Sequence, residues 1–206
     1  MKKWIFILAA VILVRVIAYN HIGWIYGDDC KEYLNSHYEF KEGKIKDLKY
    51  LMAAGDYTGK GYNKYVAVFE NGQVRLLKVN VKMHNHIIQL GPDYKVLSWE
   101  YCEKTDSLEG LYTCESDRGF VIRLKNDGTF LYAYSPFSST MPLEGKYYSE
   151  DGVTIIISHD VRKYVFLADD DVLVFLNGRS DEFNKSYNVG NLAVFYSALG
   201  DMPINE

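Results

Sequence analysis

FVIRLKNDGTFLYAY (residues 120–134) is the stretch that decides the fold, because two apolar runs flank one short polar turn. On both sides of this turn apolar and polar residues alternate, as they do in strands with one buried face. The turn contains Asp127-Gly128, a dipeptide that favours tight β-hairpin turns. The stretch therefore predicts a hairpin in which either the odd positions or the even positions, Phe130 among them, face the core.

The same alternation continues through the second half of the chain. Residues 144–158 (EGKYYSEDGVTIIIS) and 162–178 (RKYVFLADDDVLVFLNG) read as further strand pairs around short acidic turns, and residues 169–171 form one of these turns. Because such short turns allow only neighbouring strands to pair, the pattern predicts an antiparallel meander of about seven strands. Residues 191–199 are expected to close it as a last strand.

The first half switches to the two-residue repeat at Tyr62. Residues 64–82 (KYVAVFENGQVRLLKVNVK) predict a hairpin whose Asn71-Gly72 suits a type I′ turn, and two more strands are expected around residues 91–93. Residues 30–54 show mixed apolar spacing and are interpreted as irregular structure or a short helix.

Composition agrees with a strand-rich chain, because its eighteen tyrosines and ten phenylalanines favour strands. We expect a mainly β protein, built as antiparallel meander sheets or a small barrel and preceded by an N-terminal hydrophobic helix. The expected division is residues 1–29 as a membrane anchor or signal peptide, 30–104 as a first β-rich unit and 105–206 as a β-meander unit.

The N-terminal segment has two interpretations. Lys2 and Lys3 precede an apolar stretch over residues 4–26, which as a helix would be about 35 Å long and would reach across a bilayer. The alternative is a signal peptide cleaved after Ala18, which would remove residues 1–18. Both place the rest of the chain outside the cytoplasm, as a domain at the cell membrane or as a secreted protein, and we favour the anchor.

The net charge and the cysteine content limit which partners and which disulfide we expect. The 206-residue chain has a net charge of −4, so it lacks the overall basic character typical of nucleic-acid binders, and no nucleic-acid partner is expected. Its three cysteines are Cys30, Cys102 and Cys114. An exported protein can form disulfides, and a bridge between Cys102 and Cys114 stays open beside the alternative of two buried thiols.

Residues 55–65 (GDYTGKGYNKY) raise the question of a metal site. Their Asp-x-x-Gly-x-Gly spacing resembles the calcium loop of FG-GAP and VCBS-type repeats, with Asp56 at the first ligand position. Lys60 and Lys64 stand where that resemblance implies acidic or amide ligands, so the loop has too little negative charge for calcium. We interpret it as a turn that needs no ion, with Gly59 and Gly61 providing the bend.

Other site motifs are weak. His84 and His86 would share one face of a strand, but no further metal ligand can be placed beside them from sequence. No nucleophile elbow, phosphate-binding glycine loop or zinc-protease helix motif occurs. We therefore assign no catalytic, cofactor-binding or metal residues, expect no cofactor and do not expect an enzyme.

One resemblance covers about 70 residues of the second half. Its motifs are two Gly-x-Tyr strand starts (Gly110 and Gly145), the DGTF hairpin and a closing Tyr-x-Phe strand pair. Together they resemble a lipocalin-like β-meander module of uncharacterised exported proteins of Gram-positive bacteria. These are turn and core residues, so the resemblance implies a fold and a compartment and implies no activity.

The expected function is that of an extracytoplasmic, membrane-anchored binding or accessory module of the cell envelope. A tyrosine-rich sheet face or barrel mouth would hold a protein, a glycan or a small apolar ligand. The alternatives are a structural or sensory subunit of the envelope and, further off, a hydrolase or metalloenzyme.

Overall fold

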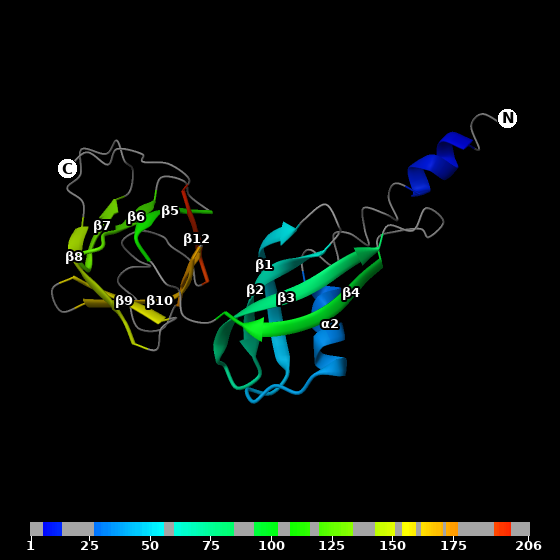
Figure 1. The fold of residues 1–206 in the computed structure, drawn as a ribbon, viewed down its shortest axis with the longest axis horizontal. Helices are drawn as coiled ribbons and strands as arrows, with labels where there is room; N and C mark the ends of the chain where they lie inside the picture. Colours follow the sequence, from blue (N-terminus) through cyan, green and yellow to red (C-terminus); the bar gives the residue numbers. More distant parts are fainter. Residues whose placement is uncertain are drawn as a thin grey trace. The chain divides into compact units, whose positions relative to one another are not determined.

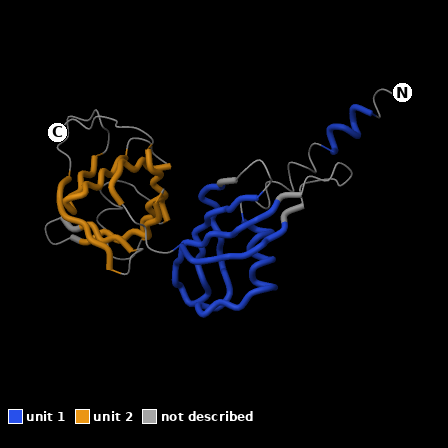
Figure 2. The backbone as a smooth tube through the Cα atoms, in the orientation of Figure 1, with its two compact units in different colours: residues 1–102 blue, residues 103–206 orange. Residues whose placement is uncertain are grey.

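The computed structural model contains two compact units, residues 1–102 and 103–206 (Figure 2). The structure describes residues 6–13, 27–55, 60–84, 93–102, 108–115, 120–133, 143–150, 154–159, 162–170, 172–176 and 192–198. The sequence analysis divided the chain two residues later, at 104/105. We describe each unit by itself.

Unit 1 contains a four-stranded antiparallel sheet and the helix α2 (Asp28–His37). The strands follow one another across the sheet as a meander, in the order β1-β2-β3-β4 (Figure 1). Their bounds are β1 Ile45–Gly55, β2 Lys60–Phe69, β3 Val74–His84 and β4 Asp93–Tyr101.

Residues 30–54 are more regular than the sequence predicted. They contain most of α2 and almost all of β1, which pairs along its length with β2. The register of β1 shifts between Ile45 and Asp47 and again between Tyr50 and Met52. Each irregularity interrupts the two-residue repeat, and for that reason β1 could not be recognised by its alternation.

The core of unit 1 lies between α2 and one face of the sheet. Cys30 and Leu34 of the helix are fully buried against Tyr65 and the alternate residues of the neighbouring strands. Asn35 links the helix to the sheet, because its side-chain amide donates to the Ile45 carbonyl at 2.9 Å and its Oδ1 accepts from the Ile45 amide at 2.8 Å. One face of the sheet is therefore buried under α2.

The turn between β2 and β3 differs from the predicted type I′ form. Only Gly72 has a positive φ, of 82°, and its amide donates to the Phe69 carbonyl at 2.9 Å. Asn71 instead accepts a hydrogen bond from the Gln73 amide through Oδ1. The loop is thus a type I turn followed by a left-handed glycine, which is another common way to close a hairpin.

Unit 2 is a closed barrel of eight antiparallel strands. Each strand pairs with its neighbours in sequence, and β12 pairs with β5 to close the ring (Figure 1). The strands are β5 Gly110–Cys114, β6 Val121–Leu124, β7 Thr129–Ala133, β8 Leu143–Ser149, β9 Thr154–His159, β10 Arg162–Asp169, β11 Val172–Phe175 and β12 Val194–Ser197. The prediction of a mainly β chain with a meander barrel is confirmed, and β12 is the closing strand expected at 191–199.

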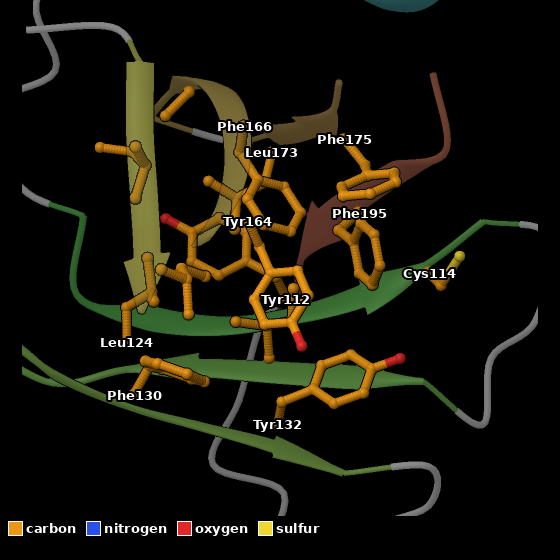
Figure 3. Packing of buried hydrophobic residues seen from close by; sticks show 14 of the residues in the cluster. Tyr112, Cys114, Leu124, Phe130, Tyr132, Tyr164, Phe166, Leu173, Phe175 and Phe195 are labelled. Atoms are coloured by element: carbon orange, nitrogen blue, oxygen red, sulfur yellow. The ribbon is translucent and has the colours of Figure 1, made fainter. Parts of the chain in front are cut away.

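The barrel interior is filled by large side chains (Figure 3). In the β6–β7 hairpin the even positions face inward, with Leu124 opposite Phe130 and Ile122 opposite Tyr132. Phe166 packs against Phe175 and Phe195, with ring centroids 5.4 and 6.0 Å apart. A small barrel of this strand number is just wide enough for its own side chains to fill it.

Residues 6–13 are helical. Within the described part of the chain, no helix is both long enough and apolar enough to cross a bilayer. Residues 14–26, the rest of the expected N-terminal helix, lie outside the described residues.

Phe130→Ala tests the register of the barrel hairpin. Phe130 is buried in the barrel core, so its truncation should lower the free energy of unfolding of unit 2 by about 3–5 kcal/mol. Tyr148→Ala on β8 is the matched control, because Tyr148 is 43% exposed and its loss should cost less than about 1 kcal/mol. Hydrogen exchange of unit 2 amides measures both, and equal effects would show that the inward set is wrongly assigned.

Gly27→Ala tests how closely α2 approaches the sheet. Gly27 has a φ of 98°, and a β-carbon there would lie 2.5 Å from the Leu48 carbonyl oxygen. Alanine at this position should introduce both backbone strain and the clash, and together they should lower the free energy of unfolding of unit 1 by about 2–5 kcal/mol. Gly72→Ala is the control, because its φ of 82° carries the strain alone and no atom lies within 4 Å of the added carbon. Hydrogen exchange of unit 1 amides should rank Gly27→Ala as clearly worse.

Candidate functional site

The face of the unit 1 sheet that points away from α2 carries an ordered set of polar and basic side chains. Residues directly opposite each other on antiparallel strands share a face. Tyr62, Asn80 and Ser98 are opposite one another on β2, β3 and β4, and form a polar row across this face. Asn80 donates to the Ser98 hydroxyl at 2.9 Å.

Two basic rows flank this polar row. One is Lys60, Lys82 and Lys95, three lysines directly opposite one another on neighbouring strands. On the other side of the polar row, Lys64 lies opposite Lys78 and Lys78 opposite Glu100. We call the set of these five lysines with Tyr62, Asn80, Ser98 and Glu100 the lysine face.

The lysine face is a local concentration of positive charge in an acidic protein. Strands β2, β3 and β4 contain six basic residues and only two acidic ones, Asp93 and Glu100. The sixth basic residue, Arg75, is opposite Ala67 on the helix-covered face. Like charges placed opposite each other on one sheet face are destabilising, so this register has a cost to the fold.

The row that contains Glu100 is held by contacts within the sheet. The Lys78 ammonium lies 2.9 Å from the Glu100 carboxylate, and this hydrogen bond raises the pKa of Lys78. The ammonium groups of Lys78 and Lys64 lie 5.0 and 5.7 Å from the centre of the Tyr62 ring, within range of a cation–π attraction. Lys64 is only 6% exposed. This row is therefore part of the sheet's own structure.

The other basic row is the accessible one. Lys60 and Lys95 are exposed and Lys82 is half-buried. The row stands where β2 and β4 begin and β3 ends, at the opposite end of the sheet from the Gly72 turn. Two of its three lysines are thus exposed to solvent at this end of the sheet.

A charged contact on the covered face has a structural role. Glu42 is 8% exposed and accepts a hydrogen bond from the Tyr101 hydroxyl at 2.6 Å, with the Arg75 guanidinium 3.6 Å away. The Tyr101 hydrogen bond, together with a backbone hydrogen bond and the positive charge of Arg75, holds the pKa of the Glu42 carboxyl below its usual value. The contact joins β4 to the segment that precedes β1.

The proposed calcium-loop remnant overlaps the lysine face. Lys60 and Gly61 begin β2, and Gly61 pairs with Gly55 and Val81, so Gly61 is a strand residue and does not form the bend. Asp56 and Gly59 lie outside the described residues. Lys60, counted above as a departure from a calcium loop, thus belongs to an exposed basic row.

The histidines are dispersed. His84 ends β3 and His86 lies outside the described residues. His37 ends α2 and stacks on Tyr33 with ring centroids 4.0 Å apart, and His159 belongs to unit 2. Across the residues that the structure describes, no group of three His, Cys, Asp or Glu side chains is placed to hold a metal ion.

In the acidic turn that the sequence predicts at residues 169–171, the first residue is a strand residue. Asp169 ends β10 opposite Val172 and is buried, whereas Asp170 is exposed. Asp171 lies outside the described residues.

The three cysteines are present as thiols. Cys102 is the last residue of unit 1 and Cys114 lies on β5 of unit 2, opposite Phe195, so the two are not on paired strands as the sequence allowed. Burial raises the pKa of the Cys30 thiol to about 12. Cys30 is therefore a core residue without thiolate character at neutral pH.

A second surface feature lies on the barrel beside β5 and β6. It is an open hollow of about 470 Å³ lined by Glu109, Gly110, Leu111, Arg123, Leu124, Lys125 and Ala198. Charges of both signs line it, and Asn126 donates to the Glu109 carboxylate at 2.5 Å. The hollow thus has no single electrostatic preference, unlike the lysine face.

Comparisons with known proteins give no functional assignment. No protein-family model matches the chain, and no curated protein matches it at a significant level. The lysine face therefore has to be interpreted from its own chemistry.

Sequence reasoning missed the lysine face although a signal was present. Lys60 and Lys64, and likewise Lys78 and Lys82, are four residues apart on strands, a spacing that places each pair on one face. The sequence does not show the register that places these lysines of β2 and β3 opposite one another and beside Lys95 of β4.

Glu42→Gln tests the contact beneath Tyr101 by its pH dependence. A carboxyl whose pKa is lower in the folded state stabilises the fold above its unfolded pKa, and this contribution is lost as the pH falls through the folded value. The ordinary pKa of this glutamate is 4.5, so the variant should be less stable than the natural protein near neutral pH. The difference should shrink as the pH falls below about 4. Urea unfolding across this range checks it, and a constant difference would show that the carboxyl does not carry the contact.

Proposed function

We propose that the protein is a binding module of the cell envelope, anchored in the membrane by residues 4–26 with both units outside the cytoplasm. The lysine face of unit 1 supports the binding role more than any other feature. A register that sets three lysines opposite one another weakens a sheet, and a fold that keeps them gains most when an anionic partner neutralises them.

The chain's N-terminal charge pattern supports the anchor. Lys2 and Lys3 stand directly before the apolar stretch, whereas residues 27–30 directly after it contain no Lys or Arg, and a positive flank favours the cytoplasmic side. Residues 6–13 of this stretch are helical. A secreted form, produced by cleavage after Ala18, is the alternative that the same sequence allows.

The structure of the barrel favours an outer surface over an interior as the binding site. Tyr112, Phe130 and Phe166 are among the large side chains that fill the interior, and all three are buried (Figure 3). A ligand inside would have to displace this packing, at a cost of several kcal/mol for each large side chain moved. We therefore assign the binding role to the sheet of unit 1 and a supporting role to the barrel.

A reporter fused after Glu206 tests the proposed topology. In a bacterial host, an alkaline phosphatase fusion should be active and a fluorescent-protein fusion that matures only in the cytoplasm should stay dark, because the lysines hold the start of the segment inside. Mass spectrometry of the recovered protein should find residues 1–18 retained. A bright cytoplasmic fusion would contradict the topology, and loss of residues 1–18 would replace the anchor with the secreted form.

A further inference from the structure

We propose that the accessible lysine row, Lys60, Lys82 and Lys95, docks on the anionic phospholipid headgroups of the membrane that holds the N-terminus. The inference rests on the proposed anchor and deepens it, because it names the partner of the lysine face. Three observations carry it: the geometry of the row, the end of unit 1 at which the row stands and the charge of the rest of the chain.

The geometry suits a surface of phosphates. Neighbouring strands lie about 4.8 Å apart, so the three lysines start within about 10 Å of one another along a line across the sheet. Their flexible side chains can each reach a separate headgroup, and an ammonium binds phosphate as a point charge. Ser98 and Asn80, in the adjacent polar row, add a hydroxyl and an amide on the same face.

The row stands at the end of unit 1 toward which the start of α2 is directed. Asn35, near the end of α2, bonds Ile45 at the start of β1, while Gly27 at the start of α2 lies against Leu48. Helix α2 therefore runs antiparallel to β1, and its first residue points toward the end of the sheet where β1 and β3 finish (Figure 1). Lys60, Lys82 and Lys95 stand at that same end.

The charge distribution makes the orientation specific. The net charge of −4 comes from residues 103–206, which contain seventeen acidic and nine basic residues, whereas residues 1–102 contain ten acidic and fourteen basic ones. An anionic membrane therefore repels unit 2 and attracts unit 1. The lysine row places three of the positive charges of unit 1 together at one end of its sheet, and the tether holds them close to the headgroups at a high effective concentration. Each lysine near an anionic surface strengthens docking about fivefold, so three act together by roughly a hundredfold.

The experiment uses the full chain inserted in two kinds of vesicle, phosphatidylcholine alone and phosphatidylcholine mixed with phosphatidylglycerol. Brief acetylation followed by mass spectrometry reports how accessible each lysine is. Lys60, Lys82 and Lys95 should react more than about tenfold more slowly on the anionic vesicles, whereas Lys146 and Lys163 should react equally on both. Added salt should remove the protection, because it screens exposed charges.

A charge-reversal variant and a matched control separate docking from a general charge effect. The triple variant carries Lys60→Glu, Lys82→Glu and Lys95→Glu. Its remaining lysines should be acetylated equally on both kinds of vesicle. Lys44→Glu with Lys146→Glu and Lys163→Glu makes the same change in net charge at exposed sites outside the row and should keep the protection. Circular dichroism of both variants checks that the fold is kept.

The possible failures can be told apart. Insertion of the apolar anchor should make the protein float with both kinds of vesicle, even at high salt. Loss of this flotation would contradict the proposed function. Flotation without protection on anionic vesicles overturns the lipid inference and leaves the anchor standing. Protection by soluble polyphosphate, with none on anionic vesicles, also overturns it and assigns the row to a soluble polyanion.

Discussion

Hydrogen bonding between β2 and β3 fixes which side chains of unit 1 lie together, and most of what we infer about this unit depends on that register. Nine residue pairs run without interruption from Lys60 opposite Lys82 to Val68 opposite Val74. A shift of one residue would place Tyr65 opposite Leu76 or Lys78, so one of the two strands would turn its core residues outward and its lysines inward. The same β2–β3 register therefore determines both the core residues under α2 and the basic residues on the opposite face. Burial of the core residues stabilises this register and so keeps the lysines opposite one another.

In unit 2, too, strand pairing determines which side chains are buried. Its eight strands close on themselves through the pairing of β12 with β5, which leaves no open edge in the described ring. Inward positions then have only one another to pack against, and tyrosine and phenylalanine supply most of the volume (Figure 3).

The β6–β7 hairpin could be predicted because alternation and an Asp-Gly turn agreed over residues 120–134. Strand β1 could not, because two register shifts break its alternation, and α2 is a short helix whose buried face shows only two residues, Cys30 and Leu34. The position of the Asn71-Gly72 turn was predicted correctly, but its type was not. A type I′ turn needs a positive φ at both residues, whereas only Gly72 has one and the Asn71 side chain accepts a hydrogen bond from the Gln73 amide.

The lysine face shows a different limit. Each lysine is present in the sequence, and Lys60 by itself is only a departure from the spacing of a calcium loop. Its meaning depends on neighbours that are more than twenty residues away in the sequence and become adjacent only through strand pairing. Residues that act together across a sheet leave a signal in sequence only when the register is already known.

The register shifts that hid β1 have a further consequence for the behaviour of many copies on one surface. Strands β1 and β4 are the edges of the unit 1 sheet, and the pairing is irregular at both, in β1 at two places and in β4 opposite Asn80 and Val81. The central pair β2–β3 has no such shift. Irregular edges are poor templates for a strand from another molecule. In the membrane-anchored state that we propose, copies would meet often, in fixed orientation and at high local density, and these edges would keep such encounters from growing into a continuous intermolecular sheet.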